Sequence, residues 1–229
     1  GQWDRMLAGK TWSAFVDTLA TPEEVDFEGL NGRINVRQSQ LRFSPPIGED
    51  LSLVVSLEDP NPQIQGGSGV TRVPGVVLEG RSEPSDRLHM KLAVLGRQIR
   101  AQTIGERSVL KKKNAWGLTM SGRFTTPFFD DRDGILFQLS GGTAIGRYVN
   151  DLDSVGSYDG IFDEEDNLKL FDVLAGYISY QHWWGEVTRS NITFGVVDLQ
   201  NPSFVEGDAY KRTIRTSANL LWTPTPRVD

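Results

Sequence analysis

Apolar and polar side chains alternate along most of this 229-residue chain, and this period of two restricts its possible folds more than any other feature. Residues 51–58 (LSLVVSLE) carry an aliphatic residue at every second position, and 87–101 (RLHMKLAVLGRQIRA) continue the alternation furthest. Successive side chains of a β-strand point to opposite faces, so the pattern predicts strands rather than helices. Further strands are predicted at 33–43, 72–82, 116–126, 135–147, 169–183, 188–198 and 212–222, with a partial strand at about 3–9. The sequence therefore predicts an all-β chain of about ten strands.

The segments between the predicted strands alternate between short and long. An antiparallel up-and-down meander gives this order when short turns lie at one rim and long loops at the other, as in outer-membrane barrels. Several predicted strands reach 11–15 residues. Soluble sheets commonly use ~5–6 residues per strand, and a tilted strand that crosses a bilayer needs ~9–11. We therefore predict an antiparallel up-and-down transmembrane β-barrel.

The charged residues of the predicted strands lie mainly on one face, and the large apolar residues lie on the other. Turning Lys91 or Arg123 toward lipid near the bilayer midplane would cost ~2–4 kcal/mol each. The apolar face is therefore predicted to meet lipid, and the polar face to line a water-filled interior. Aromatic residues near the predicted strand ends fit an interfacial girdle: Trp116, Phe124, Phe128, Phe129, Tyr180, Trp183, Trp184 and Trp222.

The chain is predicted to form a single barrel domain over residues 1–229. Its last residues, TPTPRVD, resemble a turn followed by the start of another strand, and its first residues, GQW, resemble the middle of a hairpin. Unpaired strand edges are costly in lipid because their backbone groups find no water to bind. We therefore expect a fragment of a larger barrel, with a closed ten-stranded barrel as the alternative.

Composition excludes several functional classes. The formal net charge of −6 argues against a general nucleic-acid-binding protein. The absence of cysteine and the presence of only two histidines exclude a disulfide framework, a Cys-ligated metal and a His-rich metal site. The sequence contains no recognisable catalytic constellation and no phosphate-binding glycine motif. We predict that the protein is not an enzyme and has no cofactor or metal.

Four segments together resemble one protein family. Residues 9–44, GKTWSAFVDTLATPEEVDFEGLNGRINVRQSQLRFS, resemble the constriction-loop region of the DcaP-like outer-membrane porins of Gram-negative bacteria. RVPGVVLEGR (72–81), YISYQHWWGEVTRSNITFG (177–195) and SANLLWTPTPRVD (217–229) resemble later strands of the same proteins. The resemblance implies a trimeric porin of the bacterial outer membrane with sixteen strands. It also implies that residues 10–32, with a helix-start signal at Thr21–Phe27, fold into the lumen as a constriction loop.

Acidic and basic residues are predicted to face one another across this pore. The predicted constriction loop carries the acidic residues Asp17, Glu23, Glu24, Asp26 and Glu28. The predicted pore-lining basic residues are Arg33, Arg37, Arg81, Lys91, Arg97, Arg123, Arg147 and Arg189. Opposed rows of charge create a transverse field, and arginine binds carboxylates in bidentate fashion. We expect passive diffusion of small, preferentially anionic solutes, which the family resemblance suggests are dicarboxylates.

Two further groups of charges fall in predicted long loops. Residues 150–166 include seven carboxylates, and Lys111–Lys113 form a basic run. At an outer rim the carboxylates either bind divalent cations beside lipopolysaccharide or are simply solvated. The lysines pair with lipid phosphates or with the acidic loop, or are likewise solvated. Outer-membrane lipid is therefore a predicted partner, together with the small anionic solutes and two further copies of the chain in a homotrimer.

The alternative from another class is a soluble β-sandwich that binds carbohydrate. Alternation alone does not distinguish a face in contact with lipid from a face that packs a dry core. Exposed Trp183, Trp184 or Trp222 would then serve as platforms for sugar rings. An outer-membrane barrel enzyme is a third possibility, and the sequence lacks the catalytic cluster that it requires at the outer rim.

Overall fold

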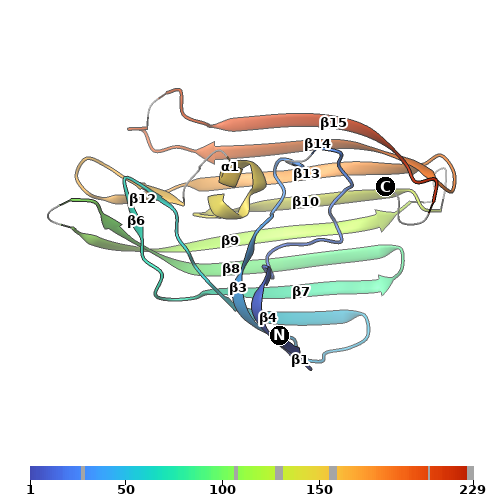
Figure 1. The fold of residues 1–229 in the computed structure, drawn as a ribbon, viewed down its shortest axis with the longest axis horizontal. Helices are drawn as coiled ribbons and strands as arrows, with labels where there is room; N and C mark the ends of the chain where they lie inside the picture. The colour runs from blue at the N-terminus through green and yellow to red at the C-terminus, as the bar shows by residue number, and fades with distance from the viewer. Residues whose placement is uncertain (27–28, 106–107, 127–130, 155–158, 206, 226–229) are drawn as a thin grey trace.

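The computed structural model describes residues 1–26, 29–105, 108–126, 131–154, 159–205 and 207–225, and its main element is a twelve-stranded sheet (Figure 1). Its spatial order is β1 (Gln2–Trp3), β2 (Met6–Trp12), β3 (Arg37–Phe43), β4 (Leu51–Glu58), β7 (Gly75–Ser85), β8 (Leu88–Thr103), β9 (Leu110–Thr125), β10 (Gly134–Thr143), β13 (Asp172–Trp183), β14 (Thr188–Gln200) and β15 (Arg212–Trp222). The short strand β6 (Gly67–Gly69) pairs with the end of β8. All neighbouring pairs in this sheet are antiparallel. The prediction of an all-β antiparallel fold is confirmed.

Most predicted strands are present, and the differences have local causes. β4 and β15 occupy the predicted ranges 51–58 and 212–222. β10 ends at Thr143, because the chain then leaves the sheet and forms the 3₁₀ helix η1 (Gly146–Tyr148) and the helix α1 (Asn150–Ser154). Residues 33–36, predicted to begin β3, pair instead with the chain around these helices: Asn35 N–H donates to the Tyr148 carbonyl.

The two faces of the sheet differ as the alternation predicts. On β8, Leu92 is 51% exposed whereas the adjacent Lys91 is 1% exposed. On β9, Leu118 is 42% exposed and the adjacent Thr119 is fully buried. Lys91 and Thr119 lie under other parts of the chain, so we call their side of the sheet the inner face and the opposite side the outer face. A broad apolar surface of this kind is unusual for a soluble monomer.

The inner face is covered by two long segments. Residues 13–26 and 29–36, together called the segment 13–36, and the region of η1 and α1 lie over it in Figure 1. Phe15, Ile34 and Tyr148 pack there against Leu95 in one apolar cluster. A second, three-stranded sheet covers the long-loop end; it comprises β5 (Ile64–Gln65), β11 (Gly160–Phe162) and β12 (Leu168–Leu170).

Within the described residues, β1 and β15 are the two edges of the large sheet and do not pair with each other. The described strands therefore form a continuous open sheet, and barrel closure is not seen in this part of the chain. Among the residues that the structure describes, no second large sheet packs on the inner face of this sheet, as a β-sandwich would require.

None of the helices in the described ranges is long and apolar enough to cross a lipid bilayer.

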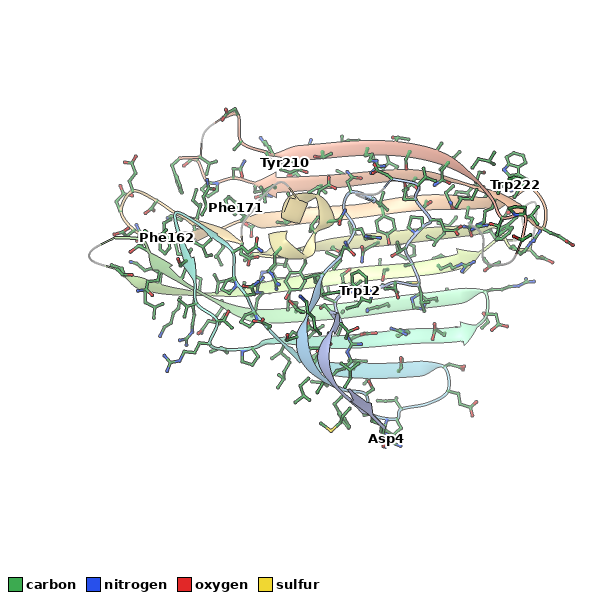
Figure 2. All side chains as sticks on the ribbon, viewed as in Figure 1. Asp4, Trp12, Phe162, Phe171, Tyr210 and Trp222 are labelled. Carbon is green, nitrogen blue, oxygen red and sulfur yellow. The ribbon has the colours of Figure 1, made fainter. Side chains whose placement is uncertain are left out.

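Aromatic residues of the predicted girdle lie near strand ends. Trp222 ends β15 at the rim opposite Tyr210 and Phe162 (Figure 2). Trp222 and Trp184 are largely exposed at that short-turn rim. Two other predicted girdle residues, Phe128 and Phe129, lie outside the described residues.

Candidate functional site: an anchored segment on the inner face

The segment 13–36 begins at a buried carboxylate at the end of β4. Glu58 accepts hydrogen bonds from Ser13 Oγ at 2.6 Å and from the Ala14 N–H at 2.9 Å. Its side chain is almost completely buried. A buried carboxylate requires such donors because it has lost its hydration. The entry of the segment onto the inner face is therefore fixed by strong, charge-assisted contacts.

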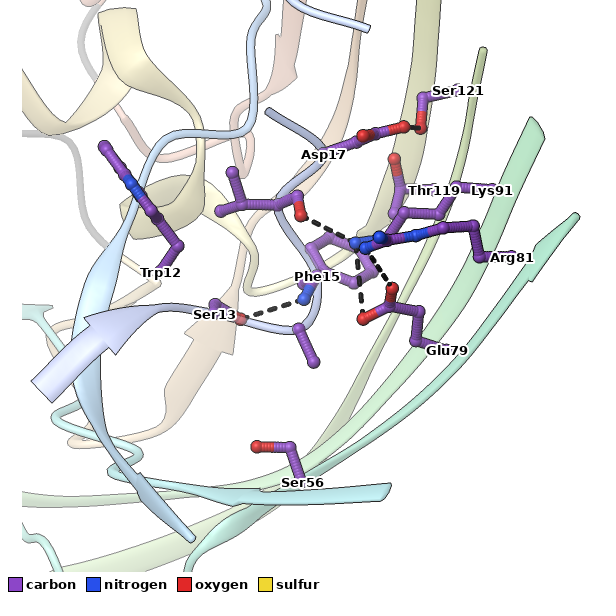
Figure 3. A network of polar contacts seen from close by, with 12 residues as sticks. Trp12, Ser13, Phe15, Asp17, Ser56, Glu79, Arg81, Lys91, Thr119 and Ser121 are labelled. Carbon is purple, nitrogen blue, oxygen red and sulfur yellow. Dashed lines mark hydrogen bonds and ion pairs between the residues drawn. The ribbon is translucent and has the colours of Figure 1, made fainter. Parts of the chain in front are cut away.

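Lys91 forms the second anchor, and Figure 3 shows its surroundings. Its Nζ donates to the Val16 carbonyl oxygen at 2.6 Å and lies 3.4 Å from Glu79 Oε2. Arg81 Nη2 also contacts Glu79 Oε1, at 2.9 Å. Lys91 was predicted to line the pore; it lies on the inner face, but its ammonium group holds the segment instead of facing open space.

Asp17 is the third anchor and binds β8 and β9. Its Oδ2 lies 2.8 Å from His89 Nε2 and accepts a hydrogen bond from Ser121 Oγ at 2.6 Å. The other ring nitrogen of His89 lies 3.0 Å from Glu83 Oε1. Burial raises the pKa of Asp17, but the hydrogen bonds from His89 and Ser121 and the nearby positive charges outweigh burial and lower the pKa to about 2. Asp17 is therefore an ionised anchor at neutral pH.

The acidic residues further along bind the opposite part of the sheet. Glu23 Oε2 accepts hydrogen bonds from Arg189 Nε at 2.6 Å and from Gln181 Nε2 at 2.9 Å. These partners lie on β14 and β13. The segment thus bridges β8 and β9 on one side and β13 and β14 on the other.

The next two acids continue this series onto β15. Glu24 Oε1 accepts from Ser217 Oγ at 3.0 Å, and Asp26 Oδ2 lies 2.8 Å from Arg215 Nη2. Glu28, the last predicted acid of the loop, lies outside the described residues. The four described acids therefore bind groups on the wall directly, and they do not form a row separated from the basic residues by open space.

The predicted helix at 21–27 is absent from the described residues 21–26, which have no helical structure. A helix of one or two turns is marginal by itself because nucleation is unfavourable. The extended chain instead lets Glu23 bind β13 and β14 while Glu24 and Asp26 bind β15. Tertiary hydrogen bonds here outweigh the local helix-start signal.

Two predicted pore-lining arginines are buried in the packing of the long loops. Arg97 binds both oxygens of Asp159, with Nη1–Oδ1 at 3.1 Å and Nη2–Oδ2 at 3.0 Å, and both side chains are fully buried. Arg147 donates to Gln38 Oε1 at 2.6 Å. The pore-lining prediction is therefore wrong for Arg97 and Arg147. Residues of the long loops cover both side chains, and the alternation does not predict where those loops lie. Asp159 is likewise not a solvated loop acid.

Arg37 lies on the outer face and does not line the inner side. On β3 it alternates with the buried Gln38 and shares its face with the exposed Leu41 and Phe43. Its guanidinium carbon lies 4.4 Å from the ring centroid of Trp12, a cation–π contact. The pore-lining prediction for Arg37 is wrong because the alternation within β3 places Arg37 on the same face as Leu41 and Phe43, opposite the buried Gln38.

Arg123 on β9 and Arg33 in the segment remain as basic groups beside open space. Arg123 lines two hollows, of about 550 and 500 Å³, that share Leu19 as well. Arg33 lines a third hollow of about 210 Å³, and Thr18 and Thr21 line both the second and the third. Neither arginine has an ion pair among the described residues. The segment Thr18–Thr21 therefore lies between two arginines that hold no carboxylate in the described part of the chain.

Sequence reasoning missed three residues that hold the segment or the loops. Arg215 is on the polar face of the predicted strand at 212–222, so the alternation contained the signal for it. His89 shares the polar face of the predicted strand at 87–101 with Lys91, so the alternation also placed it on the inner side, but it gave no sign of its partner Asp17, 72 positions away. Asp159 carried no such signal, because its partner Arg97 lies 62 positions away in the sequence.

The comparisons with known proteins agree with this architecture. The chain matches the family described as "DcaP outer membrane protein" over residues 1–229. The crystal structure of the outer membrane channel DcaP of Acinetobacter baumannii is similar in fold, with a TM-score of 0.84 at 19% sequence identity. This match covers 98% of the present chain and 63% of the solved channel, so the chain spans less than two thirds of that protein. No curated protein sequence matches the chain.

The solved channel establishes likeness of fold, and the family match covers the entire sequence. That match confirms the resemblance seen in residues 9–44, and it agrees with the prediction of a non-enzymatic protein of the bacterial outer membrane. It argues against the soluble carbohydrate-binding alternative. The chain belongs to the DcaP outer membrane protein family.

Proposed function

We propose that this chain forms the wall and the constriction of a water-filled pore for passive diffusion of small, preferentially anionic solutes such as dicarboxylates. In this proposal the outer face meets lipid, and the segment 13–36 narrows the lumen from the inner face. Solutes pass the segment Thr18–Thr21 through the hollows beside it.

The exposed guanidinium of Arg123 carries the anion preference. It stands on the inner face at the junction of two hollows and has no carboxylate partner among the described residues. Arg189 and Arg215, by contrast, already bind acids of the segment. An arginine without an internal counter-ion attracts anions from solution, and its fork geometry suits a carboxylate.

Arg33 supports the same preference on the other side of Thr18–Thr21. Its buried Nε has no hydrogen-bond partner within the described ranges, and its side chain borders the smallest of the three hollows. An anion released from Arg123 would meet Arg33 after it passes the two threonines. Successive sites of moderate affinity favour conduction because a solute can enter and also leave.

Closure of the barrel and its assembly are also parts of the proposal. Both edges of the described sheet have free backbone groups, which would be costly in lipid. The similar solved channel is longer than this chain. We propose that further strands close a sixteen-stranded barrel and that three copies associate, as the family resemblance implies.

Planar-bilayer recordings of the full-length protein with the variant Arg123→Ser test the proposal. Two unit charges ~7 Å apart in water interact by ~0.6 kcal/mol, so we expect the anion-to-cation permeability ratio to fall by about threefold. Arg5→Ser, which removes an exposed charge from the turn after β1, is the matched control and should change the ratio little. A cation-selective wild-type pore, or a ratio that Arg123→Ser leaves unchanged, would contradict the proposal.

A further inference from the structure

Two basic residues lie directly opposite each other on the outer face, near the long-loop end of β8 and β9. Arg100 and Lys112 are cross-strand partners in the β8–β9 register. Ile99 and Ala101, which flank Arg100, and Ala115, three positions after Lys112 on β9, are buried on the inner side. Because side chains alternate between faces, Arg100 and Lys112 point outward.

This pair lies just beyond the apolar part of the outer face. Moving along β9 toward Lys112, the outward residues are Met120, Leu118 and Trp116, all strongly exposed, and then Asn114. Tryptophan marks the boundary between hydrocarbon and headgroups in such proteins. Lys112 stands four residues beyond Trp116, or ~13 Å along the strand and less across the membrane because strands tilt. The pair is therefore at the level of lipid headgroups.

The two cations have no acidic partner in the described part of the chain. Arg100 Nε donates to Gln98 Oε1 at 2.7 Å, which orients the guanidinium and leaves its other donors available. Like charges directly opposite each other in a sheet destabilise it. Elsewhere on the same rim the cross-strand partners are opposite in charge: Arg212 faces Asp198 and binds it. Among the described residues, no acid compensates the pair Arg100–Lys112 as Asp198 compensates Arg212.

We propose that Arg100 and Lys112 together bind a phosphate group of lipopolysaccharide in the outer leaflet. A phosphate placed between the two strands would accept charge-assisted hydrogen bonds from both side chains and remove their mutual repulsion. The extended β8–β9 hairpin, visible in Figure 1, carries the site. The inference requires the outer face to meet lipid, and it does not depend on which solutes pass the pore.

Binding of purified lipid A to the full-length protein in detergent, followed by native mass spectrometry, tests this site. We expect the double variant Arg100→Ser/Lys112→Ser to bind diphosphoryl lipid A at least about tenfold more weakly, as expected for the loss of two charge-assisted hydrogen bonds. Dephosphorylated lipid A should bind the wild type and the double variant equally. Inorganic phosphate at the same concentration should not compete, because the acyl chains anchor the lipid beside the site.

Three further measurements make the test decisive. The charge-conserving Arg100→Lys/Lys112→Arg should retain binding, which separates loss of charge from misfolding. Arg212→Ser, at the compensated pair, should bind lipid A like the wild type. The ion selectivity of the pore in bilayers should not change in the double variant. A failure of the lipid-binding proposal can therefore be distinguished from a failure of the proposed pore function. Unchanged lipid A binding in the double variant, or equal competition by inorganic phosphate, would overturn the proposal.

Discussion

Glu23 and Arg189 are 166 positions apart in the sequence, yet Arg189 Nε lies 2.6 Å from Glu23 Oε2. Arg189 Nη2 binds the second oxygen, so the contact is bidentate. This pair joins the middle of the segment 13–36 to β14 across the inner face. The position of the segment, and with it the width of the space beside it, depends on such contacts.

Glu23→Gln should loosen the middle of the segment. The amide keeps the shape of the side chain but loses its charge, which weakens the contact with Arg189 by about 1 kcal/mol, a modest value because Glu23 is partly exposed. We expect a higher and noisier single-channel conductance. Glu186→Gln, on the exposed turn before β14, is the control. A conductance trace identical to that of the wild type would show that Glu23 does not position the segment.

Lys91→Met should lower the free energy of unfolding by about 3 kcal/mol, because it removes one member of a buried charge cluster and leaves Glu79 under-compensated. The double variant Lys91→Met/Glu79→Gln should recover part of the loss. Urea unfolding in lipid vesicles gives the free energies, and Lys10→Met at an exposed position of β2 is the control. A double variant less stable than Lys91→Met would show that the two side chains do not compensate each other.

The lowered pKa of Asp17 predicts how the stability of the protein changes at acid pH. The folded-state pKa of Asp17 is about 2, below its ordinary value of 3.8, so its contribution to stability is fully present above pH 3.8. That contribution, about 2 kcal/mol from the difference in pKa, decreases below pH 3.8 and is lost as the pH falls through 2. Unfolding measured between pH 5 and about 2 should show this decrease in the wild type. Asp17→Asn should be less stable at pH 5 and less sensitive to pH in that window.

Gly32 allows the segment to lie very close to the sheet. Its φ is +75°, and a Cβ there would lie 2.6 Å from the Gly176 carbonyl oxygen and 2.7 Å from that of Val196. Gly32→Ala should therefore displace the segment, at a cost of at least ~1–3 kcal/mol from the backbone conformation alone. Gly48→Ala is the matched control, because nothing lies within 4 Å of its added Cβ. The melting temperature and the rate of limited proteolysis of the two variants test this prediction. Equal stability of Gly32→Ala and Gly48→Ala would show that the segment does not lie so close to the sheet at Gly32.

The strands and their faces could be predicted with few errors because each depends on a local period of two. β4 and β15 occupy the predicted ranges, and Lys91 and Leu92 point to opposite faces as expected. The errors occur where the chain leaves the sheet. Strand β3 begins four residues later than predicted, because 33–36 pair with the chain near η1.

The sequence alone determined which residues are charged, which face of each strand they occupy, and which family motifs the chain carries. Only the tertiary structure decided which charged side chains form ion pairs within the protein. Arg97 meets Asp159 and Arg189 meets Glu23 through contacts 62 and 166 positions apart, whereas Arg123 has no such partner among the described residues. The reason is physical: alternation is set by neighbouring residues along the backbone, but the pairing of a charge depends on which distant segment folds over it.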